Sequence, residues 1–205
     1  MALSCIGLQP LWAAAPAKAL SADAAEVFDW VARSRDNDGL PFMIIDKRQA
    51  HLWVFDRSGK LQGAAPVLLG VARGDHTVPG IGDKKLSEIK SEERTTPAGR
   101  FVAEVGMNAR GEDVVWVDYD AAVSMHRVLT TNAQEQRARR LETATPNDNR
   151  VSYGCINVPK AFFENVVSAT VNGGNSVVYV LPESKPLRSV FSRLAMQSNL
   201  KTARR

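Results

Sequence analysis

The segment Ser152-Tyr153-Gly154-Cys155-Ile156-Asn157 contains a thiol, and a strand-like stretch upstream of it contains His126. A thiol attacks as the thiolate, and a free cysteine with a pKa near ~8.5 needs a base or a positive neighbour to ionise at neutral pH. A Cys/His pair held by a third polar group is the general form of an activated nucleophile. Ser152, three positions before the sulfur, is the candidate for that third group. The pattern predicts nucleophilic catalysis by Cys155 with His126 as base.

Gly154 lies directly before the sulfur. A glycine lets the backbone turn sharply and removes a side chain from the path of an incoming carbonyl. The backbone N–H groups around this turn are expected to hold a tetrahedral oxyanion, and losing one such donor costs about 2.7–4 kcal/mol of barrier. The structural alternative is that Cys155 is a small core residue, as most cysteines are. Each residue alone is a weak signal, so the interpretation depends on their combination.

Together these residues resemble the active-site signature of the L,D-transpeptidase catalytic-domain family. That signature is a His, a gap, Ser or Thr, His, Gly, Cys, an aliphatic residue, and Arg or Asn. The matching residues here are His126, Ser152, Gly154, Cys155, Ile156 and Asn157. Residues 44–61 resemble the opening hairpin of the family, and Thr-Thr-Pro-Ala-Gly-Arg-Phe at 95–101 resembles its Thr-Pro-x-Gly-x-Phe turn. The resemblance covers roughly residues 42–182 in one order.

The resemblance implies a mainly β fold, a β-sandwich or open barrel with a helix after the cysteine motif and flanking N- and C-terminal helices. It also implies the substrate, a peptidoglycan stem tetrapeptide. Cys155 would attack at the L-centre of the third residue, release the terminal D-Ala and pass the acyl group from a thioester to an acceptor. Tyr153, Asn157 and Arg127 are the substrate-binding candidates, with Asn157 also fixing the backbone. Neither a metal nor an organic cofactor is needed.

Two departures from the family affect the chemistry. Tyr153 replaces the second histidine of the signature, and the stretch between His126 and Cys155 is longer than the family usually shows. A phenol with a pKa near ~10 is a poor base at neutral pH. One imidazole within hydrogen-bond reach of the thiol is sufficient, so His126 is expected to serve alone.

The resemblance leaves the acceptor open among a second stem peptide, a lipoprotein and water. Water as acceptor would make the protein an L,D-carboxypeptidase. A third alternative is a non-catalytic cell-wall-binding relative, because the second histidine of the motif is Tyr153. Nothing in the sequence indicates an oligomeric state.

The composition suits a single soluble domain. A chain of 205 residues can bury one real core, and 44% hydrophobic with 23% charged residues is ordinary for a globular protein. A net charge of +4 without a basic and aromatic stripe is too weak to indicate nucleic-acid binding. We expect a secretory segment at 1–20, a helix and linker at 21–40, the catalytic domain at 41–184 and a basic C-terminal tail at 185–205.

The first 20 residues are apolar and rich in alanine, with Lys18 as their one charged side chain. Small-x-small sites at 13–15 and 17–19 predict a secretory signal and export to the periplasm or cell envelope; the alternative is an N-terminal extension. The run is too short to span a bilayer. Cleavage would remove Cys5 and leave Cys155 alone in an oxidising compartment. Structural cysteines normally pair there, so a reactive role is favoured.

Hydrophobic periodicity places these residues on elements. Residues 122–128 alternate, so Ser124 and His126 share one strand face, opposite Met125 and Arg127. The other predicted strands are 42–46, 51–56, 61–69, 100–105, 114–118 and 176–181. The predicted helices are 21–34, a short surface helix in 83–94, one after Pro159 with Phe162, Phe163, Val166 and Val167 buried, and one from 186 onward. The helix after Pro159 is expected to direct its positive end towards the sulfur and lower its pKa.

Residues 130–150 form a charged stretch with helix formers and few apolar residues. It is interpreted as a solvated surface excursion, or as a lid in which Arg137, Arg139 and Arg140 meet substrate carboxylates. His51 alternates with aromatic residues and is predicted to pack, whereas His76 lies in a Gly/Pro-rich loop and could reach a cleft. Three dispersed histidines and two cysteines lack metal-ligand spacing.

Overall fold

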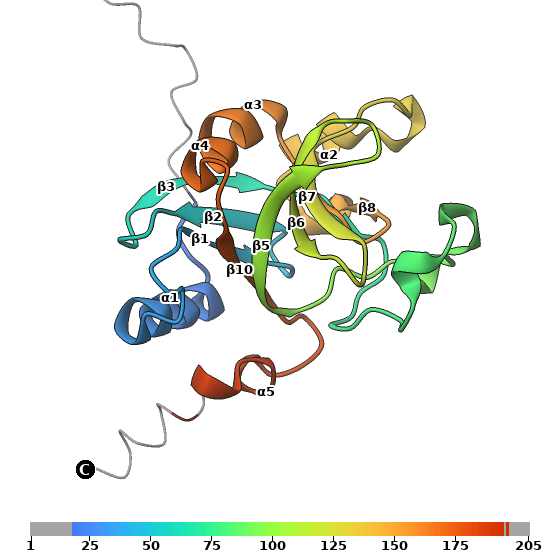
Figure 1. Ribbon diagram of the computed structural model, residues 1–205. Coiled ribbons are helices and arrows are strands. Elements are labelled where there is room, and N and C mark those ends of the chain that lie inside the picture. The colour runs from blue at the N-terminus through green and yellow to red at the C-terminus, as the bar shows by residue number, and fades with distance from the viewer. Residues whose placement is uncertain (1–17, 195, 197–205) are drawn as a thin grey trace, which may run out of the picture.

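A sheet of eight strands dominates the computed structural model, which describes residues 18–194 and residue 196 (Figure 1). Most of the predicted secretory segment, Cys5 and the end of the C-terminal tail lie outside the described residues. The strands of this sheet are β1 (Phe42–Asp46), β2 (His51–Phe55), β3 (Leu61–Pro66), β5 (Gly99–Met107), β6 (Asp113–Asp118), β7 (Val123–Arg127), β9 (Ile156–Val158) and β10 (Ser176–Leu181). A second sheet pairs β4 (Leu69–Gly70) with β8 (Arg150–Ser152). The fold is mainly β, as predicted.

The large sheet is nearly closed into a barrel. Its strand order is β3-β2-β1-β10-β5-β6-β7-β9. At the β9 edge, Asn157 exchanges two backbone hydrogen bonds of 2.9 Å with Leu68, which follows β3 at the opposite edge. The ends of the sheet are thereby joined through the backbone, which leaves few unpaired edge groups. The cysteine motif lies at this junction.

The inside of the barrel holds one apolar cluster, to which alternate residues of the strands contribute. The helical run after β9 covers it: α3 (Lys160–Phe162) continues through a π-helical turn (Phe163–Ser168) into α4 (Ala169–Val171) (Figure 1). The side chains predicted to be buried on this helix are buried: Phe162, Phe163, Val166 and Val167. An added Cβ at Gly63 would lie 2.9 Å from the Phe162 ring, so this helix packs directly on β3.

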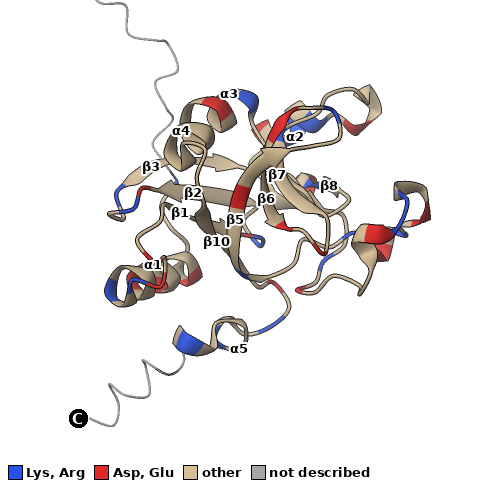
Figure 2. Cartoon of the chain, in the orientation of Figure 1, with Lys and Arg blue, Asp and Glu red and all other residues tan. Residues whose placement is uncertain are grey.

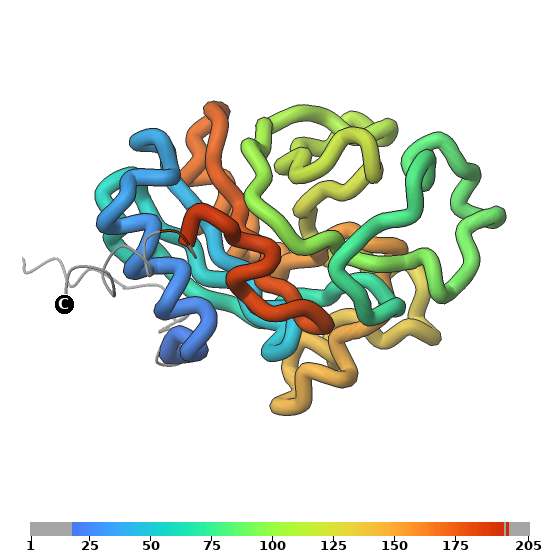
Figure 3. Tube along the Cα trace, turned by 90° about the horizontal axis from the view of Figure 1, so that it is seen from below, coloured from blue at the N-terminus to red at the C-terminus, as the bar shows by residue number. Residues whose placement is uncertain are grey.

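A second apolar cluster lies outside the barrel, beneath α1 (Ala22–Ser34) and α5 (Leu187–Val190). Figure 3 shows these two segments side by side, and Arg188 forms an ion pair of 2.8 Å with Glu26 between them. Ser21 caps α1 by accepting a hydrogen bond from the N–H of Ala24. The carbonyl of Lys18 accepts a hydrogen bond of 2.8 Å from the buried indole of Trp53. Residue 18 is therefore already part of the packed fold.

The charged stretch at 83–94 does not form the single short helix that we predicted. It contains three separate 3₁₀ turns, at Ile81–Asp83, Leu86–Glu88 and Ser91–Glu93. Ile81 and Ile89 are its buried apolar residues, which is too few to give a helix a continuous buried face. Residues 130–150 form α2 (Arg137–Glu142) between two 3₁₀ turns, Ala133–Glu135 and Pro146–Asn149. No helix among the described residues has the length and apolar character of a membrane span.

The two remaining histidines differ in burial. His51 is buried against Trp53, with ring centroids 4.8 Å apart, as expected for a packing residue. Burial, assisted by the charge of Lys18, lowers the pKa of His51 to about 4. His76 is exposed and contacts the Lys185 ammonium.

A buried charge network ties the loop between β4 and β5 to the barrel. The Lys47 ammonium is fully buried and donates hydrogen bonds of 3.0 Å to the Asp75 carboxylate and 2.8 Å to the Thr96 carbonyl. Asp75 also accepts from the Ser184 hydroxyl and from backbone N–H groups after β10. Burial alone would raise the pKa of Asp75, but these hydrogen bonds and the charge of Lys47 hold it well below its ordinary value.

We expect Asp75→Asn to lower the free energy of unfolding by about 3–5 kcal/mol, because it removes the nearer counter-ion of the buried Lys47 charge and leaves only Glu183, 3.8 Å away. A carboxyl with a lowered pKa stabilises the fold above its unfolded pKa of ~3.9 and loses that contribution as the pH falls. Urea denaturation at pH 7 and at about pH 2.5, which lies below the unfolded pKa, measures both effects. The control is Asp83→Asn, in the same loop but exposed, with an expected change under about 0.5 kcal/mol. Equal effects of the two substitutions would contradict this account.

Candidate active site

The parallel pairing of β7 with β9 brings the cysteine motif beside the predicted base. His126 is aligned with Asn157 and Met125 with Ile156. Cys155, directly before β9, therefore lies next to β7, with its sulfur 3.7 Å from the Ser124 hydroxyl and 3.6 Å from the Ala122 carbonyl. Its thiol is not in a disulfide, and its side chain is half-buried. Ser124 was not predicted as a site residue, although the alternation of the strand places it on the face of His126.

The imidazole of His126 is held by the main chain. Its Nδ1 lies 2.7 Å from the carbonyl oxygen of Arg127. A carbonyl can only accept, so Nδ1 carries the proton and Nε2 is left as the acceptor when the ring is neutral. Burial lowers the pKa of His126, but hydrogen bonding and attraction to Cys155, with the Arg127 carbonyl, outweigh it and raise the pKa above its ordinary value.

The same interactions act on the thiol with the opposite sign. Burial alone would raise the pKa of Cys155. Hydrogen bonding to His126, the charge of the imidazolium and the N–H and hydroxyl groups of Ser124 lower it to a net value below that of an ordinary thiol. The two shifts favour a thiolate and imidazolium pair, which is the reactive form of a cysteine nucleophile.

Ser152 has a different position from the one expected. Its hydroxyl donates a 2.6 Å hydrogen bond to the Cys155 carbonyl and accepts one of 3.1 Å from the Gly154 N–H. These bonds close the turn that carries the sulfur. The structure does not direct this hydroxyl to the imidazole, and the Arg127 carbonyl takes the place of the orienting third group.

Position 154 requires glycine because of its backbone conformation and its close neighbours. Its φ of +132° favours glycine, and an added Cβ would lie 2.9 Å from the carbonyl oxygen of Thr95. Its own carbonyl accepts a 2.8 Å hydrogen bond from the Thr96 hydroxyl, which in turn accepts one of 2.9 Å from the N–H of Gly70. The buried Thr96 therefore holds the cysteine turn from behind, a role that the sequence did not reveal.

Of the three predicted substrate-binding residues, one is exposed beside the sulfur. Tyr153 is 36% exposed, and the guanidinium of Arg94 lies 3.8 Å from its ring centroid. Arg94 itself is fixed by hydrogen bonds to the Ile89 carbonyl. Tyr153 is thus placed by a cation–π contact, and Arg94 brings a positive charge that the sequence did not indicate.

Asn157 is fully buried and therefore supports the site from inside. Its amide nitrogen donates to the Cys155 carbonyl at 3.4 Å, and its oxygen accepts a 2.6 Å hydrogen bond from Arg137. This agrees with the expectation that Asn157 fixes the backbone. It leaves this side chain no direct access to a substrate.

The structure does not bring Arg127 into the site. Successive strand residues face opposite sides, so its side chain lies on the other face of β7 from His126. There it forms ion pairs of 2.8 Å with Asp113 and 3.0 Å with Glu164 and covers the Phe163 ring. Its contribution to the site is the carbonyl that holds the imidazole.

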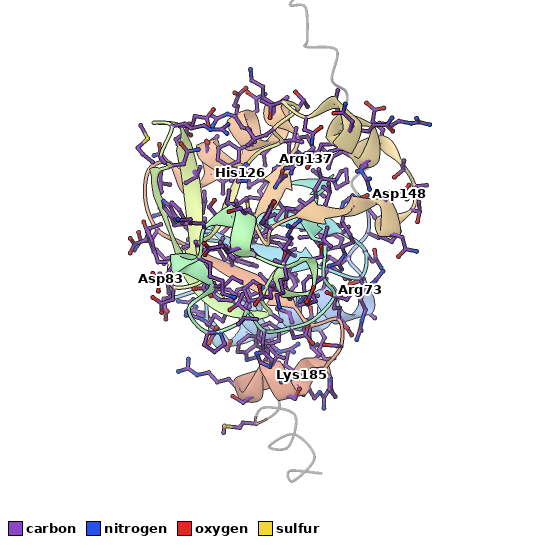
Figure 4. The ribbon with its side chains drawn as sticks, turned by 90° about the vertical axis from the view of Figure 1, so that its right-hand side faces the viewer. Arg73, Asp83, His126, Arg137, Asp148 and Lys185 are labelled. Carbon is purple, nitrogen blue, oxygen red and sulfur yellow. The ribbon has the colours of Figure 1, made fainter. Side chains whose placement is uncertain are left out.

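The charged stretch between the base and the nucleophile reaches the site through Arg137 at the start of α2. Figure 4 shows Arg137 beside His126, and its charge opposes protonation of that ring. Arg140 instead donates to the carbonyls of Glu135 and Asp148, which folds the stretch on itself, and Arg139 is exposed. Arg137 is the arginine of the three that the structure places at the cysteine.

The helix after the motif was expected to direct its positive end towards the sulfur. The helix after the motif begins only beyond β9, and three strand residues carry it roughly 10 Å from Cys155. Its positive end therefore does not account for the lowered pKa of Cys155.

Among the described residues, no group of three or more His, Cys, Asp or Glu side chains could hold a metal ion.

Neither a protein-family model nor a curated protein matches this sequence. Several solved structures resemble the fold at low identity. An L,D-transpeptidase from Mycobacterium tuberculosis matches with a TM-score of 0.40 and 14% identity, over 68% of this chain and 57% of that one. The cell shape determining protein Pgp2 from Campylobacter jejuni matches with a TM-score of 0.48 and 14% identity, over 77% and 56%. The catalytic domain of an E. faecium L,D-transpeptidase matches with a TM-score of 0.35 and 17% identity, over 69% and 96%. This chain spans 58% and 49% of two further L,D-transpeptidase structures.

We expect Cys155 to react with iodoacetamide at a lower pH than an ordinary thiol does, because its lowered pKa favours the thiolate. His126→Asn should reduce the alkylation rate at pH 7 about 10-fold or more, since only the Ser124 groups then oppose the rise in thiol pKa that burial causes. Mass spectrometry of the alkylated protein across pH 5–10 measures the profile. His76→Asn, at an exposed histidine, should leave the profile unchanged. An unaltered profile in His126→Asn would show that the imidazole does not ionise the thiol.

We expect Arg137→Gln to raise the pKa of His126, because it removes a positive charge that opposes protonation of the ring. The measurement is an NMR titration of the His126 ring in a Cys155→Ser background, which excludes coupling to the thiol. Arg139→Gln on the same helix is the matched control and should have no effect. A downward shift in Arg137→Gln would contradict the proposed contact.

Proposed function

We propose that the protein is a cysteine acyltransferase that acts on peptidoglycan stem peptides by L,D-transpeptidation. The observation that carries this proposal is the Cys155 thiol beside an imidazole whose Nδ1 is held by the Arg127 carbonyl. The substrate class comes from the ordered resemblance of the three sequence motifs. Export to the periplasm or cell envelope is part of the same proposal, since the substrate lies there.

The first half of the reaction forms a thioester. The Cys155 thiolate attacks the carbonyl at the L-centre of the third stem residue, and the carbonyl oxygen takes the negative charge. Backbone N–H groups of the Tyr153-Gly154-Cys155 turn are the proposed donors to that oxyanion. The imidazolium of His126 then gives its proton to the amine of the departing D-Ala as the C–N bond breaks.

The second half returns the enzyme to its starting state. An acceptor amine attacks the thioester, and Nε2 of His126 takes its proton. The C–S bond breaks and Cys155 leaves as the thiolate. The acceptor is a second stem peptide or a lipoprotein amine in this scheme, and water in the hydrolytic alternative. His126 alternates between acid and base, so this one histidine serves both half-reactions.

Two guanidinium groups near the cysteine motif favour an acyl donor that carries carboxylates. Arg94 lies against Tyr153, two residues before the sulfur, and Arg137, which is also ion-paired with Glu135, is bonded to Asn157, two residues after it. Planar guanidinium groups suit the carboxylates that a stem peptide carries. Tyr153 in this scheme shapes the donor site beneath Arg94 and takes no part in proton transfer.

The proposal predicts a covalent adduct between Cys155 and a carbapenem, an acyl donor that traps such thiols. Incubation with imipenem followed by mass spectrometry should show the adduct in the wild type and none in Cys155→Ala. Absence of an adduct in the wild type would favour a non-catalytic wall-binding protein. Analysis of the products from a disaccharide tetrapeptide then separates transfer, which gives a cross-linked dimer, from hydrolysis, which gives a tripeptide.

Tyr153→His restores the residue of the family signature and tests the role of the phenol. We expect this variant to retain or increase the rate of imipenem acylation, because His126 already supplies the base. Stopped-flow measurement of the acylation rate gives the comparison. Tyr153→Phe is the control and should stay within about threefold, since it keeps the ring that Arg94 contacts. Complete loss of acylation in Tyr153→His would show that the phenol has a role of its own.

A further inference from the structure

One row of residues crosses the outer face of the sheet from the sulfur to an exposed carboxylate. Ser124, 3.7 Å from the Cys155 sulfur, is paired with Trp116 on β6, and Trp116 is paired with Glu104 on β5. The alternate residues of these strands, such as Ala103, Val115 and Met125, face the barrel core. With about 4.8 Å between neighbouring strands, Trp116 lies roughly 10 Å from the sulfur on the same face.

An aromatic pair lies in the middle of this row. The rings of Trp116 and Tyr119 are stacked, with centroids 4.9 Å apart and planes 21° from parallel. Tyr119 is 58% exposed. An added Cβ at Gly106 on β5 would lie 2.9 Å from Trp116 Cδ1 and 3.5 Å from the Tyr119 hydroxyl. Both rings therefore converge over a strand position that only glycine leaves free.

Negative charge borders the aromatic pair. Glu104 is exposed and lies directly across the strand from Trp116, and among the described residues its carboxylate has no hydrogen-bond or ion-pair partner (Figure 2, the acidic segment in the middle of β5). Asp118, the last residue of β6, and Asp120, in the turn that follows, adjoin Tyr119 in sequence. The face of an aromatic ring attracts cations through its quadrupole, and a carboxylate adds a direct charge. The ligand class that complements both is an organic cation.

We propose that Glu104, Trp116 and Tyr119 form a binding surface for an alkylammonium group. This inference rests on the proposed function for its biological occupant, which is the amine-bearing acceptor of the acyl group. The acceptor docks as the ammonium on the face that carries the thioester. It then releases one proton to bulk water and moves along the row as the neutral amine, and the second proton passes to Nε2 of His126 during the attack. The surface thereby favours an amine over water as the acyl acceptor.

Binding is tested without catalysis, in a Cys155→Ala background, with n-pentylammonium as the probe and 1-pentanol as its neutral counterpart. The readout is the NMR signal of the Trp116 indole N–H, assigned by its loss in Trp116→Phe. Pentylammonium should shift this signal saturably and pentanol at least 10-fold more weakly. Glu104→Gln and Tyr119→Leu should each weaken binding at least threefold, whereas Glu88→Gln, at an exposed carboxylate on another element, should not. Equal shifts by the two probes, or no effect of Glu104→Gln, would overturn the proposal.

The two proposals fail separately. If imipenem acylates Cys155 but the Trp116 signal does not respond to pentylammonium, the ammonium surface is wrong and the acyltransferase proposal stands. If the signal responds but Cys155 is never acylated, the surface stands as a cation site and the acyltransferase proposal falls. If both hold, Glu104→Gln should lower the ratio of transfer to hydrolysis at least threefold and leave the imipenem acylation rate within twofold.

Discussion

The parallel pairing of β7 with β9 is the constraint on which the site depends. It aligns His126 with Asn157 and so places the sulfur beside the imidazole. Two parallel strands cannot be joined by a tight turn and need a crossover of a dozen or more residues, usually with a helix. Residues 128–155 provide that crossover, and α2 is its helix. The topology therefore requires an interval of at least this kind between base and nucleophile.

The cysteine turn is held from behind by groups that are costly to bury. Thr96 bonds the Gly154 carbonyl through its hydroxyl and the Lys47 ammonium through its own carbonyl. The ammonium is stabilised there by the ionised Asp75 at 3.0 Å and by Glu183 at 3.8 Å. One buried ion pair thus contributes both to the stability of the fold and to the placement of the turn. A change that neutralises Asp75 should affect the reactivity of Cys155 as well as unfolding.

Local patterns predicted the elements well and their contacts poorly. Helix α1 and the β1–β2 hairpin lie where the sequence indicated, because each depends on neighbours in the chain. The contacts of Arg94 with Tyr153 and of Arg137 with Asn157 join distant segments and leave no periodic signal. Arg127 is different: alternation along 122–128 already placed it opposite His126, so its exclusion from the site followed from the sequence. Ser152 was assigned by motif position, which does not determine the direction of a hydroxyl.

The charges on the outer face give the site a direction. Arg94 and Arg137 lie on the two sides of the sulfur, Arg137 in an ion pair with Glu135, and the Glu104 carboxylate lies two strands further on, beyond the Trp116 ring. At roughly 15 Å from the sulfur, Glu104 is nearly two Debye lengths away at physiological ionic strength, so a ligand samples the two ends of the face as distinct regions. A ligand that carries carboxylates at one end and an amine at the other is then bound in one orientation more readily than in the reverse. Under the proposed function, the donor belongs at the arginine end and the amine acceptor at the carboxylate end. The charges along this face would then place the acyl donor and the amine acceptor at opposite ends of it before any bond forms.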